Sequence, residues 1–152
     1  MSTAIKRTTL VVRDIERSVA FYSKVLGYSL AFDQEIAMSG SGYPAGKAGD
    51  LIRLVMLQGG DPAASMIGLL EHLDPRLPEP AKRPVGIGDS VLVLQTDDLR
   101  RVERNCEASG GSIFSPPHSF TIKGPDGEPI RTRSMTILDP DDFILEVNQR
   151  TG

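Results

Sequence analysis

The chain has 152 residues, 39% of them hydrophobic and 24% charged, which is typical of a globular protein with a sizeable buried core. A formal net charge of -3 and the lack of a basic run predict no nucleic-acid partner and no membrane partner. No apolar run is long enough to span a bilayer, and no signal-peptide core is recognisable. The single cysteine, Cys106, excludes an intrachain disulfide and predicts a cytoplasmic location, with the thiol facing the core from a helix.

The first half of the sequence predicts one helix among four strands. Asp14 is a favourable N-cap, because its carboxylate can accept the first free helical N–H groups, and Gly27 follows the last apolar residue at helical spacing. A glycine-rich loop is expected over 34–50, either as a lid or as a plain surface excursion. The strands of this half are predicted over residues 8–12, 28–33, 51–57 and 65–70, with a turn over 59–62.

The second half predicts the same order of elements after a proline-rich segment at 73–88. Asp97 and Asp98 precede a helix whose apolar face includes Leu99 and Cys106. A long loop rich in proline and glycine is expected after a short strand at 112–114, and it holds His118, Phe120 and Lys123. The remaining strands are predicted over residues 90–94, 131–138 and 143–147.

Near the C-terminus, a turn signal is followed directly by an apolar strand that contains one carboxylate. Asp139-Pro140-Asp141-Asp142 is a turn, since aspartate accepts local backbone bonds and proline fixes φ. Residues 143–147 are apolar except for Glu146. A carboxylate within an apolar strand is costly unless a cation, a metal or a proton compensates it.

The two halves align as an internal repeat. Pairing Asp14 with Asp98 also pairs Leu10 with Leu94 at an offset of 84. Further along, the Asp-Pro pair at 61–62 falls on that at 139–140 at an offset of 78. This pattern predicts a duplicated βαβββ module. In this alignment Gly68 corresponds to Glu146, and Arg53 corresponds to Arg131.

Two segments give the chain a resemblance to a known superfamily. They are residues 10–22 with 25–27 (LVVRDIERSVAFY and VLG) and residues 139–147 (DPDDFILEV). The chain resembles the vicinal oxygen chelate superfamily, which includes glyoxalase I, bleomycin-resistance proteins and extradiol dioxygenases. The resemblance implies an α+β fold in which two paired βαβββ modules form a cupped half-barrel sheet around a central cavity, and it implies a homodimer. The expected organisation is a single domain over 1–152, with modules at 5–72 and 89–149 joined by a linker at 73–88.

The resemblance also indicates where a metal would be held. Metal-dependent members use one residue on the first strand and one on the last strand of each module, usually His or Gln and then Glu. The matching positions here are Arg7, Gly68, Val91 and Glu146. Of these, only Glu146 offers a ligating atom, because arginine is a charged donor and the others carry no ligand atom. Since such catalytic sites usually have three protein ligands, we expect no divalent metal and no other cofactor.

Two interpretations of Glu146 exclude each other. Arg7 lies where the first metal ligand would be, so its guanidinium could pair with Glu146 and keep the carboxylate ionised. Alternatively, Glu146 is free to act as a general base. Arg7 could also be a solvated residue at the frayed start of its strand.

The remaining candidate site residues share the parity of these positions or lie in the loop predicted over the cavity. His72 could face the cavity or be a partly exposed strand terminus, while Glu71 is expected to face solvent. His118 could be a lid residue or a solvated one, and two histidines with Glu146 have no spacing that favours zinc. Arginines on strands could clamp an anion or simply protect a sheet edge. The expected ligand-binding residues are Arg7, Thr9, Gly68, His72, Val91, Val93, Gln95, His118, Phe120, Arg131 and Arg133.

The leading functional prediction is a glyoxalase/bleomycin-resistance-like protein that binds a small apolar or aromatic molecule without the usual metal. One alternative is a cofactor-free isomerase or lyase that uses Glu146 for proton transfer. Another is a metal-dependent enzyme, similar to lactoylglutathione lyase or a dioxygenase, with substituted ligands. Whether the protein is an enzyme stays open at this point.

Overall fold

The computed structural model describes residues 3–41, 43–61, 66–81 and 85–151. The chain forms two compact units, Met1–Arg83 and Pro84–Gly152. Pro62 in the predicted turn and Ser65 at the start of a predicted strand lie outside the described residues. Among the described residues, no helix is long and apolar enough to cross a membrane.

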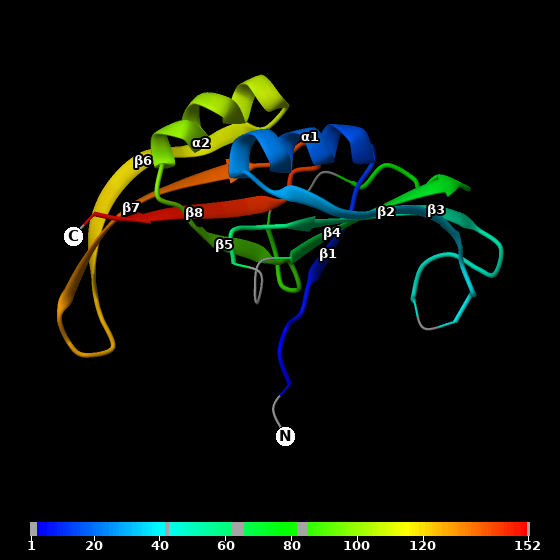
Figure 1. Ribbon diagram of the computed structural model, residues 1–152, viewed down its shortest axis with the longest axis horizontal. Coiled ribbons are helices and arrows are strands. Elements are labelled where there is room, and N and C mark those ends of the chain that lie inside the picture. Colours follow the sequence, from blue (N-terminus) through cyan, green and yellow to red (C-terminus); the bar gives the residue numbers. More distant parts are fainter. Residues whose placement is uncertain (1–2, 42, 62–65, 82–84, 152) are drawn as a thin grey trace. The chain divides into compact units, whose positions relative to one another are not determined.

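The first unit is a four-stranded mixed sheet with one helix packed on it (Figure 1). The strand order is β1-β4-β3-β2, with β1 parallel to β4 and the other pairs antiparallel. Helix α1 packs on β3 and β4. In chain order the elements are β1 (Thr8–Val11), α1 (Ile15–Leu26), β2 (Ser29–Ala37), β3 (Leu51–Gln58) and β4 (Met66–Asp74).

The second unit repeats this topology with the strand order β5-β8-β7-β6. Its parallel pair is β5 with β8, and α2 packs on β6, β7 and β8. Two βαβββ modules in an α+β fold were predicted, and this prediction is confirmed. The elements are β5 (Val91–Gln95), α2 (Leu99–Cys106), a 3₁₀ turn (Glu107–Ser109), β6 (Ser112–Lys123), β7 (Pro129–Leu138) and β8 (Ile144–Arg150).

The helix ends follow from the capping residues seen in the sequence. The Asp14 carboxylate accepts a hydrogen bond from the Arg17 backbone N–H, and Asp98 accepts one from Arg101. Gly27 ends α1 in the left-handed region, with φ of 76°. Such a conformation suits glycine because a Cβ would be strained there.

A side chain from the last strand of each unit holds the start of the helix. Glu71 Oε2 accepts a hydrogen bond from the Ile15 backbone N–H at 2.9 Å, and Gln149 Oε1 accepts one from Leu99 at 3.3 Å. The first helical N–H groups have no partner within the helix, so these acceptors satisfy them. The prediction that Glu71 faces solvent was wrong, since the residue is 7% exposed beneath α1.

The core of each unit lies between the sheet and its helix. Strand alternation sends every second side chain to this layer, as in β8, where Leu145 and Val147 are buried and their neighbours are half-buried. Cys106 is completely buried in the second unit, as the helical pattern predicted, and burial raises the pKa of its thiol to about 11.

Three strands continue at least four residues beyond the ends that the sequence pattern predicted. β2 continues to Ala37 and β4 to Asp74, so the loop starts at 38 and the linker starts after 74. The prediction of a long loop after residue 114 was wrong, because β6 continues to Lys123. Pro116 and Pro117 lie in this stretch, which is tolerated because β6 is an edge strand with register shifts on either side of Ser115.

The turn before β8 has the form that the sequence predicted. Asp139 Oδ1 accepts hydrogen bonds from the backbone N–H groups of Asp141 and Phe143 at 2.8 and 2.9 Å. Asp142 has a positive φ of 69°. The turn therefore fixes where β8 begins, and with it the face on which Glu146 lies.

Candidate functional site

The strand registers show which residues correspond in the two units. Thr9 lies opposite Gly68 in the β1–β4 ladder, and Val93 lies opposite Glu146 in the β5–β8 ladder. Gly68 and Glu146 therefore occupy equivalent positions, as the repeat predicted. Glu71 and Gln149, which hold the helices, lie three positions beyond Gly68 and Glu146. Because side chains alternate along a strand, Gly68 and Glu146 lie on the opposite face, away from the helices. We call this side of each sheet its helix-free face.

Arg7 lies across the helix-free face of the first sheet. Its Nε donates a hydrogen bond to Thr9 Oγ1 at 3.1 Å, and its Nη1 donates to Met56 Sδ at 2.7 Å. A Cβ added at Gly68 would lie 3.1 Å from both Cδ and Nε of Arg7. The glycine therefore leaves the space that the arginine side chain occupies, and thioether sulfur is a weak acceptor. Among the described residues, no carboxylate forms an ion pair with this guanidinium.

The surroundings of Arg7 on this face are mostly apolar. Leu54 lies opposite Leu70, Ile52 lies opposite His72, and Met56 lies opposite Gly68 in the β3–β4 ladder. Ile52 and Leu70 are each 8% exposed. An apolar surface with a few polar groups is the usual profile of a small-molecule site.

His72 is buried at the end of this face near the loop 38–50. It is 4% exposed, and its Nε2 has no hydrogen-bond partner among the described residues. The Tyr43 ring stacks on the imidazole with a centroid distance of 6.5 Å. The alternative of a partly exposed strand terminus is therefore excluded. The Tyr28 ring packs edge-on against the ring of Tyr22 in α1, with a centroid distance of 6.3 Å.

Glu146 lies half-buried on the helix-free face of the second sheet. Its Oε1 accepts a hydrogen bond from Asn148 Nδ2 at 2.9 Å, while Asn148 Oδ1 is buried without a partner among the described residues. Val93 and Thr136 flank Glu146 on the neighbouring strands. The carboxylate is therefore oriented by one donor, and Oε2 has no hydrogen-bond partner within the described part of the chain.

Most of the predicted residues of the second half share this face. Val91 and Val93 are 45% and 65% exposed. His118 lies opposite Ser134, its ring stacks on that of Phe120 at 5.9 Å, and both residues are in β6 rather than in a loop. Asn148 was not among the predicted residues, although it is two residues beyond Glu146 and therefore lies on the same face of β8. The predicted residues on the helix-free face of this unit are Val91, Val93, Gln95, His118, Phe120 and Glu146.

Arg131 and Arg133 do not lie on the helix-free face. Arg133 is opposite Gln149, whose side chain holds the start of α2, so both arginines of this strand point to the helix side. The alignment of Arg53 with Arg131 was also wrong. Arg53 is opposite Glu71 and Arg133 is opposite Gln149, so Arg53 and Arg133 are the equivalent pair.

Arg53 is fully engaged in ion pairs on the helix side. It binds both carboxylate oxygens of Asp33, at 2.8 and 2.7 Å, and Glu16 at 2.6 Å. The hydrogen bonds from Arg53 lower the pKa of Asp33, and those to Asp33 and Glu16 raise the pKa of Arg53. This arginine therefore links β2, β3 and α1 and offers little to a ligand.

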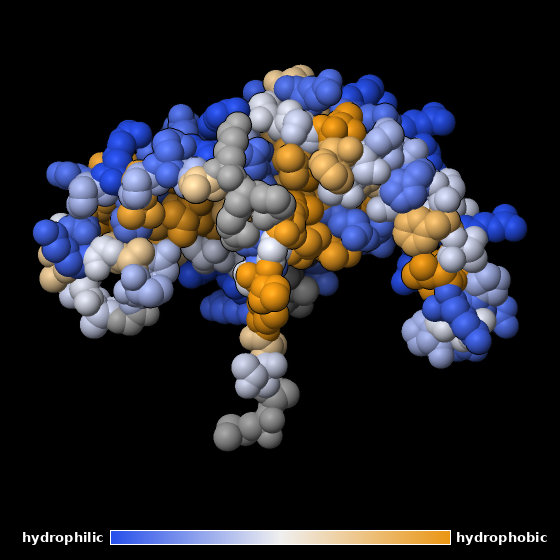
Figure 2. All heavy atoms as spheres, turned by 180° about the vertical axis from the view of Figure 1, so that it is seen from behind, coloured by the Kyte–Doolittle hydropathy of each residue, from blue (hydrophilic) through white to orange (hydrophobic). Residues whose placement is uncertain are grey.

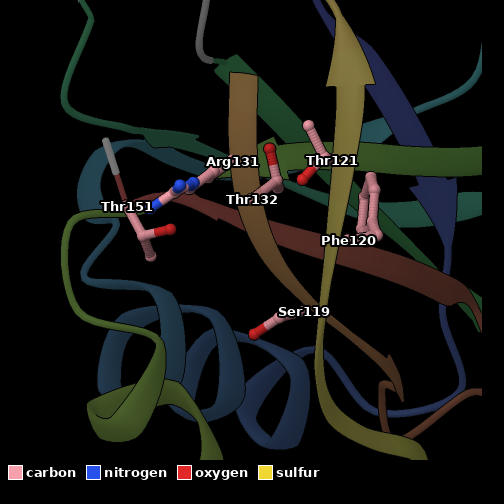
Figure 3. Close-up of a pocket in the computed structure, with 6 residues that line it drawn as sticks. All are labelled: Ser119, Phe120, Thr121, Arg131, Thr132 and Thr151. Carbon is pink, nitrogen blue, oxygen red and sulfur yellow. The ribbon is translucent and has the colours of Figure 1, made fainter. Parts of the chain in front are cut away.

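A shallow pocket of about 230 Å³ lies at the outer end of β6 and β7 (Figure 3). In Figure 3 the Arg131 side chain extends towards Thr151, and Phe120 projects on the other side of its strand. The hairpin that carries the pocket shows hydrophobic patches among hydrophilic atoms at the lower right of Figure 2, and Ile122 is 48% exposed. The pocket is lined by Ser119, Phe120, Thr121, Arg131, Thr132 and Thr151.

The residues at the positions that the resemblance assigns to a metal do not fit a divalent cation. Gly68 has no ligand atom, and a Cβ there would lie 2.7 Å from Thr9 Oγ1 and close to Arg7. Val91 is apolar, which leaves Glu146. Within the described residues, no group of three or more His, Cys, Asp or Glu could hold a metal ion.

Comparison with known proteins identifies one family over nearly the whole chain. The profile of the Glyoxalase/Bleomycin resistance protein/Dioxygenase superfamily matches residues 4–147. Among curated proteins, no relative reaches a significant level of similarity.

Solved structures of low sequence identity share the fold. A glyoxalase family protein from Bacillus cereus is 14% identical with a TM-score of 0.80, over 100% of this chain and 97% of that chain. A glyoxylase/bleomycin resistance protein/dioxygenase domain from Frankia sp. EAN1pec is 19% identical with a TM-score of 0.61, over 99% and 94%. A fosfomycin resistance protein from Listeria monocytogenes, complexed with Mn(II) and sulfate, is 13% identical with a TM-score of 0.58, over 99% and 95%.

Proposed function

Because the chain belongs to the glyoxalase/bleomycin resistance/dioxygenase superfamily, we propose that it binds a small apolar or aromatic organic anion on the helix-free faces of its sheets. In this proposal Arg7 anchors the anionic group, and binding does not require the divalent metal that many members of the superfamily use. The chain shares its two βαβββ modules with this superfamily, whose members bind small molecules.

The observation that carries the proposal is the position of Arg7 over Gly68. The side chain is held by Thr9 Oγ1 and Met56 Sδ, and neither of these is charged. A guanidinium has five N–H donors, so most of them stay available to a ligand. A planar fork of donors that is fixed in advance loses little entropy when it binds a carboxylate, often through two parallel bonds.

The apolar surroundings support an organic ligand rather than an inorganic ion. Leu54 and Met56, both half-exposed, form the floor beside Arg7. Burying the flat side of an aromatic ring there is favourable at about 25 cal/mol per Å² of apolar surface removed from water. The arginine would then fix the orientation, while the apolar contact would supply much of the affinity.

The proposal is tested with two matched probes, cinnamate and cinnamamide, which differ in charge but not in shape. Calorimetric titration should show that the wild-type protein binds cinnamate at least about tenfold more tightly, because a hydrogen bond to a charged group contributes about 1.5–3 kcal/mol. Arg7→Met should remove this preference. Arg100→Met, a change at an exposed arginine of α2, is the matched control and should retain it. Equal affinity of both probes for the wild-type protein would contradict the proposal.

A second candidate function is proton transfer by Glu146, as in a cofactor-free isomerase or lyase. It is favoured by the Asn148 hydrogen bond, which orients Oε1 and leaves Oε2 for a substrate. The ion pair between Glu146 and Arg7 is the competing possibility and stays a prediction, since it would join the two units. In this second function, Glu146→Gln abolishes turnover of a bound substrate while its affinity is retained, and retained turnover would exclude the role.

A further inference from the structure

The strongest unexplained feature outside the Arg7 position is the buried imidazole of His72. The residue is 4% exposed, and its Nε2 has no partner among the described residues. A buried polar atom without a hydrogen bond is costly, whether it is an N–H donor or a lone pair. We therefore expect a bound molecule to supply the missing hydrogen-bond partner of Nε2.

The burial of His72 involves a loop with a compact base. The Met38 backbone N–H donates to Asp50 O at 2.8 Å, and the Gly49 N–H donates to Met38 O at 2.9 Å. These bonds join the two ends of the loop 38–50, as in an Ω-loop. The loop carries the Tyr43 ring onto His72. The unpartnered nitrogen therefore lies beside an aromatic side chain near the C-terminal end of β4 and not in open solvent.

His72 lies on the same helix-free face as Arg7. Gly68, Leu70 and His72 alternate along β4 with the residues that contact α1, and Arg7 lies over Gly68. His72 is four positions beyond Gly68 along β4, a separation of about 13 Å at about 3.3 Å per residue. Leu70 and Leu54 lie between them. The face thus has a charged donor at one end, an apolar middle and an unpartnered polar atom at the other end.

We propose that His72 Nε2 is a second recognition point and that the ligand is a hydroxylated aromatic carboxylate. The carboxylate binds Arg7, the flat frame covers the half-exposed Leu54 opposite Leu70, and the hydroxyl at the far end bonds His72. An oxygen-to-oxygen length of about 7–10 Å fits, because a hydrogen bond adds about 3 Å at each end. A hydroxyl can both donate and accept, so it satisfies either tautomer of His72. This inference rests on the proposed function, since it requires Arg7 to hold the carboxylate.

The test compares 4-hydroxycinnamate with cinnamate by calorimetric titration. In the wild-type protein the hydroxyl should increase affinity about tenfold. His72→Phe keeps a ring against Tyr43 but removes Nε2, so the gain should disappear. His72→Gln keeps a donor and an acceptor and should restore part of the gain. Arg7→Met should weaken both probes and leave their ratio near tenfold.

The unfolding of the ligand-free variants gives an independent readout. His72→Phe removes an unpartnered buried atom, so its melting temperature should be equal to or above that of the wild-type protein. A clear fall would mean that the nitrogen already has a partner, such as an ordered water, and would overturn the inference. So would Arg7-dependent binding of cinnamate with no gain from the hydroxyl, or a gain that persists in His72→Phe. If neither probe shows Arg7-dependent binding, the proposed function fails as well.

Discussion

The substitution Arg7→Met separates the role of a ligand anchor from that of an internal ion-pair partner. In the first unit Arg7 makes two hydrogen bonds to uncharged acceptors, one of them a sulfur atom. Methionine keeps an unbranched apolar side chain over Gly68. Losing such half-exposed contacts should lower the free energy of unfolding by less than about 1 kcal/mol. If Arg7 instead compensated the half-buried Glu146, its removal would cost more than about 1 kcal/mol, towards the roughly 3–5 kcal/mol lost when a buried pair is broken.

The assay is urea denaturation of the ligand-free protein, Arg7→Met, Glu146→Gln and the double variant. We expect the losses in the free energy of unfolding from the two single changes to add up, within about 0.5 kcal/mol, to the loss in the double variant, as for independent sites. A coupling energy above about 1 kcal/mol, or a large loss in Arg7→Met that Glu146→Gln restores, would refute the anchor role. It would instead support the ion pair with Glu146, and few N–H donors of Arg7 would then be available to a ligand.

Three further predictions concern metal, helix anchoring and pH. At 1 mM Mn(II) the melting temperature should not rise. A site with a dissociation constant of about 10 µM would instead add about 2.7 kcal/mol to the free energy of unfolding at this hundredfold excess. Stoichiometric metal in the purified protein would contradict this prediction. Glu71→Gln should lower the free energy of unfolding by about 1 kcal/mol in urea, because a neutral acceptor replaces a charged one at the start of α1, and no change would show that the charge is unimportant there. For Asp33→Asn, melting curves from pH 7 to pH 2 should show a small deficit, under about 1 kcal/mol, at neutral pH. This deficit should vanish as the pH falls through the pKa of Asp33, which Arg53 lowers from 3.8; a deficit that persists at pH 2 would exclude the ion pair as its cause.

The repeat in the sequence predicted most of the fold, because its signals are local. Asp14 and Gly27 bound α1 through caps that depend on a few neighbouring residues. The same holds for the turn at Asp139. Because the turn at Asp139 fixes where β8 begins, strand alternation decides the face on which Glu146 lies, and the repeat assigns the same face to Gly68.

The errors arose where tertiary contacts override local preference. Pro116 and Pro117 indicate a loop, yet β6 tolerates them because an edge strand forms backbone hydrogen bonds with a neighbouring strand on one side only. Glu71 was expected in solvent because its partner, the Ile15 N–H, is distant in sequence. His72 is buried beside Tyr43, which no periodicity could reveal. Asn148, which donates to Glu146, was missed because a side-chain hydrogen bond has no signature in the sequence.

The most direct test of the central claim is to observe the guanidinium of Arg7 by NMR while cinnamate is added. The Nε–H resonance, assigned by its absence in Arg7→Met, should shift in a saturable way with the dissociation constant that calorimetry gives. Cinnamamide at the same occupancy should shift it much less. Saturable binding of cinnamate that leaves the Arg7 resonance unmoved would contradict the account, because the carboxylate would then be held elsewhere.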